Sequence, residues 1–315
     1  MQYETFTTND GCTIAFQTSL SLTTPPTQPT SPSSFPKTCI LLMHGFSGSS
    51  AYFNRNFDLA KNHWIVAPDM RGHGRSSHTP GGYHVARLAT DLRELLTHLR
   101  QSVTSPVRFV PVGCSIGAAI LWTYVELFGE DADMAGFVFV DQAPLQDRSL
   151  FGAWDENRAH RGCYDERTML AAQEAWISRP AETHRALVEE CLGYRYCPLP
   201  SDKVSEEERR RDEEFFTGIS KACDGVWLAR LLADHTRYDH REAIELITRP
   251  VMVLAGRRSG CFPLAGMAET VERVRKGGSG MDRRATLEVF ESGHWLFYEE
   301  PERFNWEVLA FVERL

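Results

Sequence analysis

The sequence predicts an α/β fold with a mostly parallel sheet, and two observations carry the prediction. Short, continuous apolar runs recur along the chain: CILLMHG (39–45), HWIVAPD (63–69), VRFVPVGCS (107–115), GFVFVDQ (136–142), VMVLAG (251–256) and TLEVFES (286–292). Such runs are typical of strands buried on both faces of a parallel sheet. Between them lie segments with helical spacing of apolar residues, notably 85–100 and 301–315. This alternation predicts crossover helices on both faces of a doubly wound sheet.

The first strands are predicted to be antiparallel. Two short alternating runs, residues 3–7 and 13–18, flank Asn9-Asp10-Gly11, which is a strong hairpin signal. Residues 21–36 follow and are rich in Pro, Ser and Thr, with few side chains able to bury a face. We expect this segment to be a mobile surface loop.

The alternation stops between about residues 144 and 247, where helix formers dominate and no strand-like run occurs. We therefore predict a core of residues 1–144 and 248–315 with a helical insert at 145–247. A charged run at 201–216 within the insert is expected to be a solvated helix face, with an interaction motif as the alternative. The aromatic residues of the insert are expected to pack it onto the sheet or to line a pocket: Trp154, Trp176, Phe215, Phe216, Trp227 and Tyr238.

Composition narrows the possible partners. The net charge is −8 and the pI is near 5.8, so the chain lacks the basic surface that nucleic acids or anionic membranes require. No apolar stretch approaches the ~18 residues of a membrane span, and the N-terminal segment does not resemble a signal peptide. We expect a soluble, cytoplasmic protein that acts on a small molecule. Its oligomeric state is not predicted.

No metal or cofactor is predicted. The eight cysteines are scattered, with neither a CxxC pair nor a Cys/His cluster at zinc spacing. We expect reduced thiols, with a disulfide between Cys191 and Cys197 as the alternative. Glycine-rich nucleotide-binding motifs are also absent from the sequence.

The strongest chemical motif is Gly113-Cys114-Ser115-Ile116-Gly117, between an apolar strand and a predicted helix. Small residues beside the serine permit a sharp turn that presents its hydroxyl at the carboxyl edge of the sheet. The helix that follows directs its amino terminus at the site, where it stabilises negative charge. Ser115 is therefore the candidate nucleophile.

Two further segments complete the candidate machinery. His294 follows the last strand and can reach a serine across the sheet edge as a general base. The loop after His44-Gly45 offers the amide of Phe46, which together with that of Ile116 would form an oxyanion hole. His44 itself is expected to shape this loop by hydrogen bonding.

In this order the motifs resemble the α/β-hydrolase superfamily. The resemblance rests on His44-Gly45, the turn DMRGHGRS at 69–76, the serine motif, Val140-Asp141-Gln142, and Gly293-His294 with Glu299-Glu300-Pro301. It spans residues 38–315. It implies an eight-stranded, mostly parallel sheet, a helical cap after the sixth strand, and a triad of serine, acid and histidine.

One element of the family pattern is missing. The aspartate expected after VMVLAG is replaced by Ser259 in GRRSGCFP. Asp141, at the end of the neighbouring strand, is the alternative acid, as in a few members of the fold. Glu291, Asp234 and Asp239 are weaker candidates, and a dyad of Ser115 and His294 that works without an acid is a further alternative. Arg257 and Arg258, in the loop that lost its acid, would bind a substrate carboxylate if they faced the pocket, and are otherwise solvated.

The resemblance and the residues favour a serine hydrolase that cleaves an ester, lactone or thioester through an acyl-enzyme on Ser115. The missing acid keeps open a different reaction on the same fold, carbon–carbon bond cleavage or cyclisation of a specialised metabolite. A receptor that binds a ligand without turnover is the third possibility, because fold alone does not fix function.

Overall fold

The computed structural model describes residues 1–22, 36–147, 157–158, 165–277 and 285–315. Its centre is an eight-stranded sheet with the order β1-β2-β4-β3-β5-β6-β7-β8. Strands from β3 to β8 run parallel, while β1 and β2 add an antiparallel edge beside β4. The predicted mostly parallel sheet is confirmed. Most of the predicted loop at 21–36 lies outside the described residues.

The antiparallel edge is the hairpin expected from the sequence. β1 (Gln2–Thr7) pairs with β2 (Thr13–Thr18) in full register, with Gln2 opposite Thr18. Gly11 closes the turn with φ of +82°, a conformation that glycine adopts without steric cost.

The central strands coincide with the apolar runs. They are β3 (Thr38–Met43), β4 (Trp64–Pro68), β5 (Arg108–Cys114), β6 (Phe137–Val140), β7 (Val251–Gly256) and β8 (Ala285–Phe290). Every residue of β3, β4, β6 and β7 is buried, as continuous apolar strands require. β8 differs, because it is the outer strand: its interior positions are half-buried or exposed.

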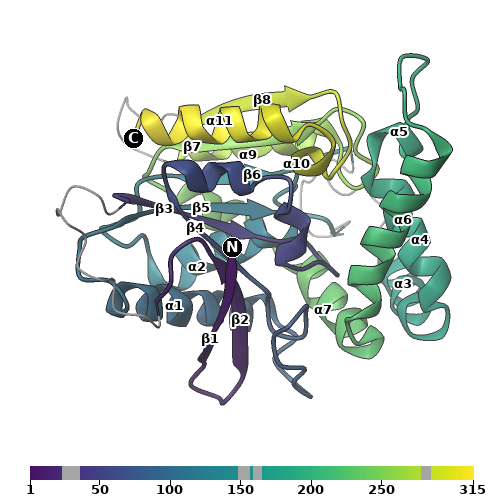
Figure 1. Ribbon diagram of the computed structural model, residues 1–315. Coiled ribbons are helices and arrows are strands. Elements are labelled where there is room, and N and C mark those ends of the chain that lie inside the picture. Colours follow the sequence, from purple (N-terminus) through teal and green to yellow (C-terminus); the bar gives the residue numbers. More distant parts are fainter. Residues whose placement is uncertain (23–35, 148–156, 159–164, 278–284) are drawn as a thin grey trace.

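Helices cover both faces of the sheet, with α11 on one side and α1 and α2 on the other (Figure 1). α1 (Val85–Gln101), α2 (Ile116–Phe128), α8 (Arg241–Glu245) and α9 (Leu264–Lys276) contact one another in sequence and form one layer. α11 (Pro301–Glu313) contacts α10 (Leu296–Glu299) and the short helix η3 (Phe57–Lys61), while α10 also contacts η2 (Ser50–Phe53). Leucines of α1 at the predicted helical spacing are buried against the core.

A helical insert follows β6. It contains α3 (Glu166–Ser178), α4 (Pro180–Cys191), α5 (Gly193–Tyr196), α6 (Glu206–Lys221) and α7 (Gly225–Arg237), which stand at one end of the sheet (Figure 1). α8 precedes β7 and packs on α2 and α9, so this last helix of the insert lies against the sheet layer. Among the described residues, no helix is both long and apolar enough to span a membrane.

Candidate active site

Ser115 stands at a sharp turn between β5 and α2. Its φ of 53° and ψ of −124° place a residue with a side chain in a region that costs on the order of 1–3 kcal/mol and is concentrated at functional sites. Its amide donates to Val140 O of β6 at 2.9 Å, and its carbonyl accepts from the amide of Ala118 at 2.8 Å. These bonds hold the serine in the strained conformation predicted by its motif. Ser115 is only 8% exposed, so the cap covers it more than the sequence implied.

The glycines around Ser115 allow three segments to approach closely. A Cβ on Gly113 would lie 2.6 Å from the amide nitrogen of Ala118, and one on Gly117 would lie 2.7 Å from Met43 O of β3. A Cβ on Gly45 would lie 3.2 Å from the Cβ of Ser115. The loop after β3 therefore passes directly beside the candidate nucleophile.

Two backbone amides near Ser115 are available to an anion. Ile116 is the first residue of α2, so its amide has no carbonyl partner one turn earlier in the helix, and no side chain caps this end. Phe46 follows Gly45, and among the described residues its amide donates no hydrogen bond. Both belong to segments that meet at Ser115, as the oxyanion-hole prediction requires.

His294 is held by Asp141. The distance from His294 Nδ1 to Asp141 Oδ2 is 2.6 Å, and both side chains are buried, Asp141 completely. Because Nδ1 is engaged, the proton-accepting nitrogen on the other side of the ring is Nε2. Ser115 and His294 line the same cavity, although no hydrogen bond joins these two described residues. In an unliganded site such bonds are often long and form only with substrate.

Asp141 lies where β6 ends, and three donors converge on its carboxylate. Oδ1 accepts from the amide of Gly256 at 2.9 Å, and Oδ2 accepts from the hydroxyl of Ser259 at 2.7 Å as well as from His294. Asp141 also has a positive φ of 47°. Ser259 thus contacts the same carboxylate oxygen as His294.

Burial and charge act in opposite directions on His294. Burial alone lowers the pKa of the imidazolium, but a negative Cys261 and the hydrogen bond to Asp141 outweigh it and raise the pKa above the usual value. The hydrogen bond with Cys191 lowers the pKa of Cys261, while burial raises that of Cys191 well above the ordinary thiol value.

His44 has the structural role expected for it. It is fully buried, its Nδ1 lies 2.8 Å from Gly45 O, and its Nε2 accepts from the amide of Met70 at 3.0 Å. Burial lowers the pKa of His44 to about 4, so it stays neutral. It joins the loop after β3 to the loop after β4.

The cavity above Ser115 has a volume of about 80 Å³. Its walls combine apolar side chains with a few polar groups, and they include Leu187, Leu232, Phe262, Trp295, Gln146 and His235. Gln146 Nε2 and His235 Nε2 lie 2.9 Å apart. Sequence reasoning missed these wall residues, since those from the insert carry no motif that marks them.

Arg257 and Arg258 are not among the residues that line this cavity, so the condition under which they would bind a substrate carboxylate is not met at this cavity. Arg257 donates to Glu291 at 2.6 Å on the exposed surface. Arg258 forms an ion pair with Asp202 at 2.6 Å, within a different pocket. The alternative acids also have other partners: Glu291 holds Arg257, Asp234 accepts from the amide of Val85, and Asp239 pairs with Arg241.

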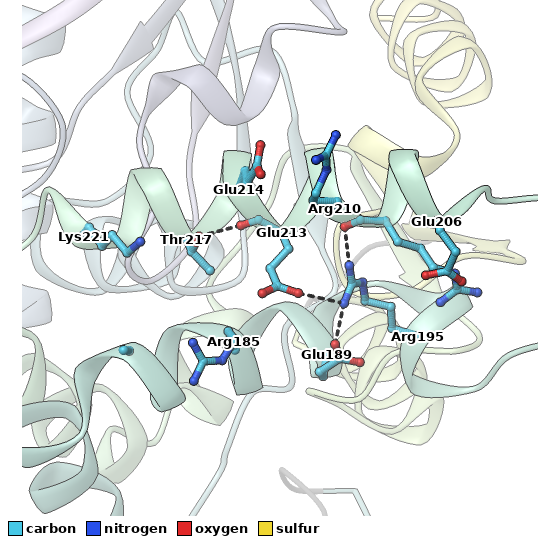
Figure 2. A pocket seen from close by; sticks show the side chains of 11 residues that line it. Arg185, Glu189, Arg195, Glu206, Arg210, Glu213, Glu214, Thr217 and Lys221 are labelled. Atoms are coloured by element: carbon cyan, nitrogen blue, oxygen red, sulfur yellow. Dashed lines mark hydrogen bonds and ion pairs between the residues drawn. The ribbon is translucent and has the colours of Figure 1, made fainter.

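A surface groove with a volume of about 570 Å³ lies away from Ser115, between α4 and α6 (Figure 2). Its lining carries charges of both signs. Arg195 bonds to Glu189 and to the carbonyl of Arg209, and lies 3.4 Å from Glu213. The charged run at 201–216 forms part of this helix face. Ser115 and His294 do not line this groove, so it is separate from the candidate active site.

Most predicted aromatic residues of the insert serve packing. Phe216 stacks on Trp295 with ring centroids 3.7 Å apart, Trp227 contacts His73, and Trp176 contacts Phe46. Phe215 stacks on Tyr298, and Tyr238 stacks on His240. None of these five lines the cavity of Ser115. Trp154 lies outside the described residues.

Comparisons with known proteins agree with this architecture. The chain matches the family model described as alpha/beta hydrolase fold over residues 38–301, more than half of its length. An uncharacterised protein of Mycobacterium tuberculosis is 34% identical over 95 residues, which are 30% of this chain and only 26% of that protein. The matched region thus spans about a quarter of the first curated relatives.

Two other proteins are similar over most of the chain. The 3-oxoadipate enol-lactonase 2 of Acinetobacter baylyi is 24% identical over 266 residues, 84% of this chain and 82% of that protein. The solved structure of an esterase from Exiguobacterium antarcticum has a TM-score of 0.77 at 18% identity and covers 98% of both chains. At this identity the structural likeness shows the fold alone.

Proposed function

Because this chain belongs to the alpha/beta hydrolase fold family, we propose that it is a serine hydrolase that cleaves an ester, lactone or thioester through an acyl-enzyme on Ser115. The observation that carries the proposal is the hydrogen bond of 2.6 Å between His294 and Asp141 at the cavity that contains Ser115. The names of the similar lactonase and esterase support carboxylic ester chemistry.

The geometry suggests how each group would act. Nε2 of His294 accepts the hydroxyl proton as Ser115 attacks the carbonyl carbon, and Asp141 stabilises the imidazolium that forms. The amides of Phe46 and Ile116 bind the oxyanion of the tetrahedral intermediate. His294 then returns the proton to the leaving group, and a water molecule repeats the sequence to release the acid.

Asp141 also weakens the case for other chemistry. Carbon–carbon bond cleavage or cyclisation gained support only from the missing acid at position 259, and Asp141 supplies a carboxylate bonded to the histidine. A receptor that binds a ligand without turnover would not need the strained backbone conformation of Ser115.

The test is labelling by a fluorophosphonate, which reacts with activated serines, followed by peptide mass spectrometry. We expect one adduct, on Ser115, and none in Ser115→Ala. Thr123→Ala is the control, because this buried hydroxyl lies on α2 but not at the cavity. Failure of the folded wild-type protein to react would refute an activated Ser115.

A further inference from the structure

Three potential metal ligands meet beside the candidate active site. The sulfurs of Cys191 and Cys261 and a ring nitrogen of His294 all lie within 4.8 Å of one another, and all three residues are buried. Cys191 ends α4 of the insert, Cys261 follows β7, and His294 follows β8. The fold thus assembles a Cys/Cys/His group that sequence spacing does not show.

The sulfur separation is close to that of two zinc ligands. Cys191 Sγ and Cys261 Sγ are 3.4 Å apart, and both cysteines are free. With Zn–S bonds of about 2.3 Å, two thiolates of a tetrahedral site lie about 3.8 Å apart. A disulfide needs about 2.05 Å, so the metal requires the smaller displacement.

The surroundings of His294 suit a metal ligand. Asp141 binds Nδ1, which leaves the lone pair of Nε2 for a cation and reproduces the carboxylate–histidine–metal arrangement common around zinc. The three side chains also line the cavity that contains Ser115. A fourth position for water is therefore open, as in sites where zinc has three protein ligands.

Close backbone packing fixes the cap cysteine against the core. The amide of Trp295 donates to Cys191 O at 3.2 Å, and Gly260 donates to Glu190 O at 2.9 Å. Gly193 and Gly293 approach so closely that a Cβ on either would collide with the backbone of the other. The ligands are thereby held together before any ion binds.

We propose that Cys191, Cys261 and His294 form a binding site for Zn²⁺ whose occupation inhibits the enzyme. Two thiolates and a neutral imidazole coordinate the ion, and any protons on the thiols and on Nε2 of His294 pass to solvent. The bond to Nε2 uses the lone pair that would accept the proton of Ser115. Binding follows from the ligand geometry alone, whereas inhibition rests on the proposed function.

Binding is tested on the full chain, freed of metal and kept reduced with a phosphine, by titration with Co²⁺. We expect one bound ion with a thiolate-to-cobalt charge-transfer band and tetrahedral visible bands, both removed by Zn²⁺. Cys191→Ser, Cys261→Ser and His294→Ala should each weaken binding by about a hundredfold or more, since even outer-shell changes cost about 10–100-fold. Cys197→Ser is the matched control, because its exposed thiol lies outside the cluster.

The cobalt spectra of the variants test whether these residues bind the metal. Unchanged cobalt spectra in Cys191→Ser and Cys261→Ser would overturn it, as would loss of the band in Cys197→Ser. An intact mass lower by two hydrogen atoms, with no metal bound under the reducing conditions, would also contradict it, because the pair would then be a disulfide.

Inhibition is measured separately, by hydrolysis of an aryl ester in the presence of Zn²⁺. The wild type and Cys197→Ser should lose activity over the concentration range in which they bind the ion, and a chelator should restore it. Cys191→Ser should need about a hundredfold more Zn²⁺. Metal binding by a chain that hydrolyses no ester, lactone or thioester would refute the proposed function and leave the metal site intact. Hydrolysis unaffected by bound Zn²⁺ would refute the inhibition.

Discussion

Replacement of Asp141 by asparagine tests whether this carboxylate orients His294. Three donors point at the side chain, from Gly256, Ser259 and His294. The asparagine oxygen can accept from Gly256, but its NH₂ group then faces Ser259 and His294. To avoid opposing donors, His294 must carry its proton on Nε2, which can no longer accept the proton of Ser115.

The expected loss is large because the wrong tautomer disables the base. The same change in an aspartate–histidine–serine triad of another fold lowers turnover by about 10⁴, which corresponds to about 5.4 kcal/mol in the activation free energy. We expect a similar fall in kcat for aryl-ester hydrolysis by Asp141→Asn, with the folded state retained by circular dichroism. Asp58→Asn is the control, since this exposed acid pairs with Lys61 on the surface.

A second substitution asks whether a carboxylate at the usual position can replace Asp141. Ser259 Oγ is bonded to the oxygen that His294 uses, so Ser259→Asp in the Asp141→Asn background should recover at least about tenfold of the lost rate, about 1.4 kcal/mol. Ser259→Asp alone brings two carboxylates together, and one of them must take a proton. Asp141→Asn with more than about a tenth of wild-type activity would refute the reasoning.

Three other predictions concern the same site. Ser115→Ala and His294→Ala should each lower kcat by several orders of magnitude, and the double variant should lose little more because the pair acts as a unit; additive losses in steady-state kinetics would argue for separate roles. The rate of ester hydrolysis should increase with pH, with a midpoint above about 6.5, because the raised pKa of His294 keeps the base protonated at lower pH. Asp141→Asn should shift this midpoint to lower pH, and an unchanged midpoint would show that the pH dependence does not arise from the His294–Asp141 pair. Leu187→Ala should improve kcat/KM for longer p-nitrophenyl esters relative to the acetate, since Leu187 bounds a cavity of about 80 Å³; an unchanged acetate-to-octanoate ratio would place the acyl chain elsewhere.

The sheet was predictable because its strands have one simple signal. Strands buried on both faces are largely apolar, and β3, β4, β6 and β7 are buried at every residue. The outer strand β8 has partly exposed positions, so its run does not indicate a strand buried on both faces. The division of the chain at 145–247 stays a prediction, because α8 contacts the helices of the sheet layer although it lies inside that range.

The placement of the side chains at the active site could be predicted only partly from the sequence. Ser115 and His294 occur in motifs whose local backbone determines where they lie, whereas the arginines at 257 and 258 gave no sign of their partners. Arg258 is held by Asp202, which is distant in sequence and belongs to the insert. Contacts between the insert and the core depend on tertiary packing, so the periodicity of apolar residues in the sequence does not predict them.

The same limit explains the cysteines and the acid. Spacing along the chain argued against a metal site, yet Cys191 reaches Cys261 across 70 positions because paired glycines let two backbones touch. Parallel strands, in contrast, bring their carboxyl ends to one edge, so an acid can move from the end of β7 to the end of β6 and still face the loop after β8. Asp141 pairs with His294 across 153 positions by this route. The edge of the sheet therefore determines where the carboxylate lies, whereas either of two neighbouring strands can carry it, and Ser259 donates a hydrogen bond to the carboxylate of Asp141.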